Sequence, residues 1–356
     1  MSAIDAGADE YIVKPIRWEK LREVIERVLP PGSDGASPDK PVPEFIPAFH
    51  AGEVLGRAWI DPGARIIHGW FTVATRGCVE VRAEGEIIIL DAGSGLRGLG
   101  IALEAEFADR PIRSTLLISH FHWDHIRACL FLPAYKQKNS LRVLGYEGAR
   151  ASLATALATQ METSFFPISL SDMPSAIVIE ELKETKFAIG KVKVDSRRLY
   201  HPGKCFGYRL TTRNGSIAYL PDNEPYDAAQ PLRREPTGNR AGTDGLDPAE
   251  ERKLELVEFL HRSEILIIDT QYTDDEYSHK VGWGHGSLSS VVSLAIDAEV
   301  RKLFLFHHDP THDDRMVDEM VEAHGCWCSE SGKPIEVEAA REGAEVWLGA
   351  STAIPA

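Results

Sequence analysis

Hydrophobic positions along most of this chain form short blocks that alternate between a strand pattern and a helix pattern. The strand pattern predicts strands at Val79–Val81, Ile87–Asp91, Thr115–Ser119, Leu141–Tyr146, Val192–Val194, Tyr208–Thr211, Ile217–Leu220, Ile265–Asp269 and Leu303–Phe306. The helix pattern predicts helices at Ala149–Gln160, Ala249–His261, Leu288–Ala298 and Arg315–His324. This order predicts an α/β (α+β) fold in which two sheets carry helices on their outer faces, a four-layer αββα sandwich.

The N-terminal part of the chain has a different character. A short strand at Tyr11–Val13 and a helix at Trp18–Leu29 are predicted there, followed by Pro30–Pro47 with six prolines. Such a composition stiffens a chain and buries no core, so it predicts a linker. A polar, glycine-rich stretch at Arg233–Asp247 predicts a mobile loop inside the main domain. The chain therefore divides into residues 1–30, a linker over residues 31–51, and one large domain over residues 52–356.

Composition and charge narrow the classes of partner. The chain has 356 residues, 43% hydrophobic content and a formal net charge of −15, which suits a globular protein and opposes binding to extended nucleic acid. A small anionic substrate stays open, because bound cations reverse the potential inside a cleft. Apolar runs are far shorter than the roughly 20 residues that span a bilayer, and no signal-like segment follows Met1, so we expect no membrane and a cytoplasmic location. The five scattered cysteines predict reduced thiols: Cys78, Cys129, Cys205, Cys326 and Cys328.

The densest chemistry follows the predicted strand Thr115–Ser119, where the chain reads His120-Phe-His122-Trp-Asp124-His125. In extended chain His120 and His122 project to the same side, and a turn then brings Asp124 and His125 to a neighbouring position. Imidazole and carboxylate ligands suit zinc, and manganese or iron also accept this set. The pattern therefore predicts a divalent metal site at the end of this strand.

This H-x-H-x-D-H pattern resembles that of the metallo-β-lactamase superfamily, and the likeness extends from about Val79 to the C-terminus. The resemblance implies that His120, His122 and His201 bind one ion. It implies that Asp124, His125 and His307 bind a second ion, and that Asp222 bridges both. Asp91 would be a structural carboxylate that orders the metal loop. For the last ligand, the adjacent His308 is the alternative to His307, and Asp309, His312, Asp313 and Asp314 are expected to shape the loop and cap the next helix.

Two bridged cations would generate a hydroxide at neutral pH and stabilise charge on an attacked phosphoryl or carbonyl group, so hydrolysis is the expected reaction. Either Asp124 or Asp222 could accept the proton of the attacking water. Gly282-Trp-Gly-His285-Gly-Ser287 resembles the His-Ser element of the phosphodiesterase and RNase Z-like branches, where His285 would act on the substrate phosphate. A plain turn with Ser287 as a helix cap is the alternative, and Tyr272, Glu276 and Tyr277 could wall the pocket.

Together these features predict a binuclear metal-dependent phosphodiesterase that acts on a small phosphodiester such as a cyclic nucleotide. The alternatives are another metallo-hydrolase, acting on a thioester, lactone or lactam, and a non-catalytic metal-binding sensor. The segment AIDAGADEYIVKPI resembles the C-terminal end of a response-regulator receiver domain, which implies a two-component signalling context; simple packing of this segment is the alternative. Exposed sheet edges leave a homodimer open.

Overall fold

The computed structural model describes residues 65–69, 77–127, 131–148, 151–162, 164–224, 248–331, 335–341 and 343–348. All of them belong to one compact unit that spans Asp61–Ala356. The receiver-like segment over residues 1–30, the linker over residues 31–51 and the loop Arg233–Asp247 lie outside the described residues.

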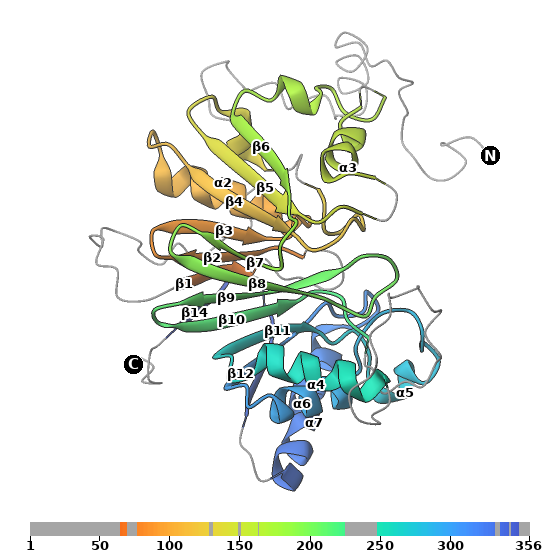
Figure 1. Ribbon diagram of the computed structural model, residues 1–356. Coiled ribbons are helices and arrows are strands. Elements are labelled where there is room, and N and C mark those ends of the chain that lie inside the picture. Colours follow the sequence, from red (N-terminus) through yellow and green to blue (C-terminus); the bar gives the residue numbers. More distant parts are fainter. Residues whose placement is uncertain are drawn as a thin grey trace, which may run out of the picture. The chain divides into compact units, whose positions relative to one another are not determined.

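Two sheets form the body of the domain (Figure 1). The first has the strand order β14-β1-β2-β3-β4-β5-β6 and the second β13-β12-β11-β10-β9-β8-β7. The strands of the first sheet are β1 (Arg65–Gly69), β2 (Val79–Ala83), β3 (Glu86–Leu90), β4 (Arg113–Ile118), β5 (Ser140–Gly145), β6 (Ala176–Glu181) and β14 (Ala344–Trp347). Those of the second are β7 (Lys186–Ile189), β8 (Val192–Arg198), β9 (Phe206–Thr212), β10 (Gly215–Leu220), β11 (Ile265–Asp269), β12 (Lys302–Phe306) and β13 (Glu336–Ala339).

Helices cover the outer face of each sheet, as Figure 1 shows. On the first sheet they are α2 (Gly95–Phe107) and α3 (Leu153–Gln160), and on the second they are α4 (Pro248–Leu260), α6 (Leu288–Asp297) and α7 (Asp314–Ser331). The shorter elements are α5 (Asp274–Tyr277), η2 (Leu132–Tyr135) and η3 (Leu170–Asp172). Within the described part of the chain no helix is both long and apolar enough to cross a bilayer.

Strand β3 shows how the sequence produces these layers. Its Ile88 and Leu90 belong to the apolar cluster between the two sheets, where they meet residues such as Tyr208 and Ile217. The alternate residues Ile87 and Ile89 belong to a second cluster under α2 and α3. A strand buried on both faces needs a continuous apolar run, which the sequence supplies here. A third cluster lies between the second sheet and helices α4, α6 and α7, so the predicted four-layer αββα sandwich is confirmed.

The structure also adds elements that the hydrophobic pattern does not predict: β1, β6, β7, β13, β14 and helix α2. Helix α2 contains Gly95, Gly98 and Gly100, and glycine lowers helix propensity by about 1 kcal/mol per residue, which hides the helix in the sequence. At Gly100 a side chain would meet Pro133 and Leu132 at 3.0–3.1 Å, so close packing on η2 favours glycine there. Helix α3 begins at Leu153, later than predicted, because the Ser152 hydroxyl accepts a hydrogen bond from Thr155 N as its N-cap.

Strand direction determines where polar side chains collect. Strands β3, β4 and β5 are parallel to one another, as are β10, β11 and β12. Parallel neighbours end at the same edge of a sheet, so residues that follow these strands lie close together. Asp91, His120, Asp222 and His307 all stand just beyond the ends of such strands, and Asp269 is the last residue of β11.

Candidate metal centre

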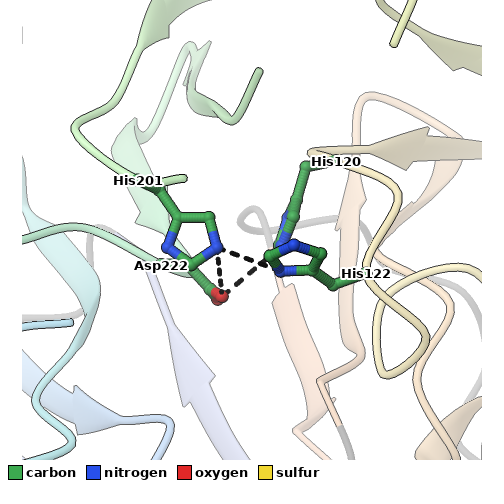
Figure 2. A group of neighbouring side chains, drawn as sticks. All are labelled: His120, His122, His201 and Asp222. Atoms are coloured by element: carbon green, nitrogen blue, oxygen red, sulfur yellow. Dashed lines mark hydrogen bonds and ion pairs between the residues drawn. The ribbon is translucent and has the colours of Figure 1, made fainter. Parts of the chain in front are cut away.

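Four of the predicted ligands form one cluster of side chains: His120, His122, His201 and Asp222. Figure 2 shows the two histidines that follow β4 facing His201 and Asp222, which come from the second sheet. Asp222 Oδ2 lies 3.5 Å from His120 Nε2 and 3.5 Å from His201 Nε2. His201 Nε2 lies 3.0 Å from His122 Nδ1. Four potential donor atoms thus converge on one point.

A second cluster shares the same aspartate. It contains Asp124, His125 and His307. His125 Nε2 lies 3.2 Å from both Asp124 Oδ2 and Asp222 Oδ1, and His307 Nε2 lies 3.3 Å from Asp124 Oδ2 and 3.7 Å from Asp222 Oδ1. Because one oxygen of Asp222 faces each cluster, this carboxylate has the arrangement of a bridging ligand.

The two clusters fit divalent cations better than they fit a hydrogen-bond network. Among the described residues, the buried atoms His120 Nε2, His125 Nε2 and Asp222 Oδ1 have no hydrogen-bond partner, although polar atoms surround them. Leaving such atoms unpaired is costly, so a ligand is expected to satisfy them. Atoms about 2 Å from a tetrahedral zinc ion lie roughly 3.3 Å from one another, close to the spacings in both clusters. The spacing of these atoms and their unpaired state show that both clusters can hold divalent metal ions.

Asp91 fixes the orientation of the first-sheet ligands. Its Oδ2 accepts a hydrogen bond from His125 Nδ1 at 2.8 Å and another from Ser119 Oγ at 2.7 Å, and Ser119 Oγ also lies 3.0 Å from His120 Nδ1. Tyr219 donates its hydroxyl to the same oxygen. A partner on Nδ1 leaves Nε2 of each ring as the free donor that faces the cluster. Asp91 therefore occupies the position of a carboxylate that orients ligands.

A backbone carbonyl orients the third histidine of the first cluster. His201 Nδ1 lies 2.8 Å from the carbonyl oxygen of Gly284. The loop that carries Gly284 is held in turn by the buried Glu224, whose carboxylate accepts hydrogen bonds from the backbone N–H groups of Gly282 and Gly284 and from the Tyr277 hydroxyl. Glu224 is not among the residues that the sequence pattern predicts. Its position two residues after Asp222, next to a loop rich in glycine, is the signal that points to it.

His285 lies against both clusters. Its ring is parallel to that of His307 with centroids 5.0 Å apart, and its Nδ1 lies 2.8 Å from Asp269 Oδ2. Burial lowers the pKa of His285, but the Asp269 carboxylate more than offsets this, so the pKa is raised above the ordinary imidazole value. His285 also forms a potential ligand group with Asp222 and His307. The Asp269–His285 pair is a further feature that the sequence analysis does not identify.

The structure distinguishes His307 from His308. Strand β12 ends at Phe306, and His307 adopts a left-handed backbone with φ of +58°. This conformation is uncommon for a residue other than glycine and turns the His307 ring into the second cluster. His308 is buried elsewhere, and neither of its ring nitrogens has a hydrogen-bond partner among the described residues. Burial lowers the pKa of His308 to about 4.

The remaining predicted residues have separate roles. Asp313 accepts a hydrogen bond from Met316 N and so caps α7, while the Asp309 carboxylate binds Thr311 in the preceding turn. His312 binds the Glu276 carboxylate, which also forms the capping box of α5. The Glu276 carboxylate therefore holds these two structural contacts. Tyr272 packs against His285. Ser287 is the N-cap residue of α6, but its side chain makes no capping hydrogen bond to the helix. Cys78 and Cys205 are free and buried.

Comparison with known proteins adds an independent observation. Residues 87–237 match the family model described as "Beta-lactamase superfamily domain". This part of the chain is therefore similar to a β-lactamase superfamily domain. The match begins in β3 and includes the residues from His120 to Asp222 that form the first cluster.

Individual relatives have low sequence identity to this chain but align over most of its length. Ribonuclease Z of Thermoplasma acidophilum is 23% identical over 270 residues, which is 67% of this chain and 82% of the relative. Among solved structures, the metallo-β-lactamase fold protein YhfI of Bacillus subtilis has a TM-score of 0.55 at 15% identity, covering 80% of this chain and 99% of that one. Unliganded yeast PDE1 has a TM-score of 0.55 at 13% identity, covering 80% and 100%. The structural likenesses show the shared metallo-β-lactamase fold.

Proposed function

We propose that this metallo-β-lactamase-fold protein is a binuclear metal-dependent hydrolase that cleaves phosphodiesters. The observation that carries the proposal is the pair of ligand clusters joined by Asp222, each with donor atoms spaced as around one ion. His120, His122 and His201 would hold one cation, Asp124, His125 and His307 the other, and Asp222 both. The N and O donors suit zinc, and manganese and iron accept the same set.

When bound, two such cations supply Lewis acidity and a water that ionises near neutral pH. The chain's own residues would do the rest. Asp222 and Asp124 offer carboxylate oxygens beside the reacting centre that can orient the attacking water and accept its proton. His285, with a pKa raised by Asp269, keeps a proton that its inward ring nitrogen can donate to the departing alkoxide oxygen.

A phosphodiester is the favoured substrate because His285 adds a proton donor to the metal clusters. Hydrolysis of a phosphodiester expels an alkoxide, which is a poor leaving group until it is protonated. The name of one sequence relative points the same way, since a ribonuclease cleaves the phosphodiester bonds of RNA. Within this class we propose a small diester such as a cyclic nucleotide. RNA is the second candidate, because the sequence relatives are ribonucleases and the similarity covers 82% of ribonuclease Z.

The test compares two leaving groups in the purified, metal-loaded protein. Bis(4-nitrophenyl) phosphate releases 4-nitrophenolate, which leaves without a proton, whereas 3′,5′-cyclic AMP must expel an alkoxide. We expect both to be hydrolysed and a chelator to stop both reactions. The variant His285→Ala should keep its metals and lose roughly 10²–10⁴-fold in kcat on cyclic AMP, with a much smaller loss on the nitrophenyl ester.

The matched control is His279→Ala, which removes an exposed histidine six residues away in the same segment. It should leave both rates unchanged. Equal rates of His285→Ala and the parent protein on cyclic AMP would exclude the proton-donor role of His285. Metal-loaded protein that cleaves no phosphodiester, including a 3′-extended RNA, would contradict the proposed function as a whole.

A further inference from the structure

Two exposed tryptophans stand in the segments that carry the metal clusters. Trp123 lies between His122 and Asp124 with 68% of its surface exposed, and Trp283 precedes Gly284 with 58% exposed. Indole rings usually bury most of their surface in a core. A single exposed apolar side chain needs no explanation, but both of these indoles adjoin residues of the metal-cluster segments.

Each indole is accompanied by a cation. The Lys280 ammonium lies 4.2 Å from the centroid of the Trp283 ring. The Arg127 guanidinium lies 6.0 Å from the centroid of the Trp123 ring, and its Nε donates a hydrogen bond to the Trp123 carbonyl oxygen. Flat aromatic faces next to cationic groups are the combination by which proteins bind single-stranded nucleic acid, since bases stack and phosphates need positive charge.

The Trp283 side is connected to the proton donor through ring contacts. Lys280 Nζ also lies 5.9 Å from the centroid of the Tyr272 ring. Tyr272 in turn packs edge-on against His285, with centroids 6.1 Å apart and an interplanar angle of 85°. The Tyr272 ring thus contacts both Lys280 and His285.

We propose that Trp123 and Trp283 stack on nucleobases of the substrate, and that Arg127 and Lys280 attract its phosphates. The proposal rests on the proposed phosphodiesterase function and names the residues that would recognise the base of a nucleotide substrate. It is compatible with the net charge of −15, which gives little electrostatic attraction for nucleic acid. Stacking does not depend on overall charge, so an acidic protein can still select a base.

The experiment compares two chromogenic diesters with the same leaving group. Thymidine 5′-(4-nitrophenyl) phosphate carries a nucleoside on the retained side, and methyl 4-nitrophenyl phosphate carries a methyl group. The measured quantity is the ratio of their kcat/KM values. In the metal-loaded wild-type protein we expect the nucleoside ester to be favoured by about tenfold to a hundredfold, the range of one stacked base.

The variants Trp123→Ala and Trp283→Ala should each lower this ratio, and the double variant should bring it close to one. The conservative variants Trp123→Phe and Trp283→Phe should restore most of it, because a phenyl ring still stacks. Trp347→Ala is the matched control, since Trp347 is also exposed, at 46%, but lies on edge strand β14, four strands away from β4. The ratio should not change in this control.

A wild-type ratio near one, or a ratio unchanged in the double variant, would overturn the stacking proposal and leave the phosphodiesterase function intact. If wild-type protein hydrolyses neither ester, the fluorescence readout described next decides the stacking proposal, and hydrolysis of the natural substrates decides the phosphodiesterase function. A second readout needs no turnover: AMP should quench the intrinsic tryptophan fluorescence of metal-loaded protein, and ribose 5-phosphate should not. Loss of this quenching in folded Trp283→Ala or Trp123→Ala supports stacking, and its persistence in both contradicts it.

Two natural substrates distinguish which kind of molecule places its base on the tryptophans. Cyclic AMP and a 3′-extended RNA hairpin both present a base beside a phosphodiester. The one whose hydrolysis falls further in the double tryptophan variant is the one that places its base on these rings. Equal rates of the wild-type protein and the double variant on both substrates would overturn the proposal.

Discussion

At the scale of single residues, the site depends on Asp91, a carboxylate that belongs to neither ligand cluster. It is fully buried and accepts hydrogen bonds from Ser119 N, Ser119 Oγ, His125 Nδ1 and the Tyr219 hydroxyl. Its own backbone has a φ of +60°, a conformation that costs of order 1 kcal/mol or more outside glycine. The fold tolerates this strain where it aims a carboxylate at the ligands.

The first prediction concerns this carboxylate. Asp91→Asn replaces one carboxylate oxygen by an amide NH₂ group, which cannot accept a hydrogen bond, at a site where four donors point to the side chain. We expect metal affinity to fall by roughly 10–100-fold, as happens when a group that orients ligands is lost. Chelator competition measures the dissociation constants. Tyr219→Phe, which removes one of the four hydrogen bonds, is the control and should lose far less; unchanged affinity in Asp91→Asn would refute this role.

The second prediction concerns pH in the metal-free protein. Burial opposes the charged form of His307, but Asp222 and Asp124 raise its pKa to about 9. Burial lowers the pKa of His120 and of His201. Below pH 9 His307 therefore holds a proton that a cation must displace. The metal affinity of the second cluster should rise from pH 6 to pH 9, whereas the metal affinity of the first cluster should change little above pH 7.

Calorimetric titrations in buffers of different ionisation enthalpy count the protons released as each ion binds. At pH 7 we expect proton release with one of the two ions and almost none with the other. The variant His307→Asn, which keeps a polar side chain without a titrating ring, should lower this release. It should not abolish it, because Asp222 and Asp91 outweigh burial and also raise the pKa of His125. Equal release with both ions would contradict the assignment of the two clusters.

At the scale of elements, the site depends on loops that follow parallel strand ends and on one close approach between two loops. Gly284 has a φ of +93°, and a Cβ there would lie 2.2 Å from Pro202 Cδ and 2.5 Å from His201 Nδ1. A side chain at this position must displace the His201 ring. The glycine therefore allows the loop of His285 to reach the first cluster.

The third prediction follows from this contact. Gly284→Ala should weaken metal binding at the first cluster and lower turnover at least tenfold, because His201 loses its position. Gly282→Ala is the matched control: its φ of +88° carries a similar strain, but nothing lies within 4 Å of the added Cβ. Metal content and diester hydrolysis of both variants are the measurements, and similar losses in the two would indicate backbone strain instead of the clash with His201.

Sequence reasoning predicts elements well where apolar runs are continuous, as in β3 and β11, and it locates polar residues at their ends. It does not predict β6, whose alternating residues are half-exposed, or helix α2, whose glycines resemble a loop. It names the residues of both clusters because they resemble a family pattern. The Asp269–His285 pair and Glu224 depend on tertiary contacts across 16 or more positions, which spacing along the chain does not reveal.

At the scale of the whole domain, the clusters join its two halves. His120, His122, Asp124 and His125 follow a strand of the first sheet, whereas His201, Asp222 and His307 follow strands of the second. Each cluster draws ligands from both sheets. Any ion bound there adds links between two layers that meet through apolar packing and hydrogen bonds such as that from Tyr219 to Asp91.

The fourth prediction is that metal removal lowers thermal stability. A ligand at a thousand times its dissociation constant stabilises the folded state by about 4 kcal/mol, which corresponds to a melting temperature higher by on the order of 10 °C in a domain of this size. Scanning calorimetry with and without chelator measures the difference. In Asp222→Ala, which lacks the shared ligand, the chelator should have little effect; an equally large effect would show that the stabilising ions bind elsewhere.

The central claim is that the Asp222-linked clusters hold two cations that make this protein a phosphodiesterase. The most direct test determines metal content by mass spectrometry and bis(4-nitrophenyl) phosphate hydrolysis on the same purified sample, before and after chelation and after adding metal back. Our account predicts about two ions per chain, loss of turnover on chelation, and recovery of both together. Protein that binds no metal on reconstitution, or that binds two ions and hydrolyses no diester, would contradict it.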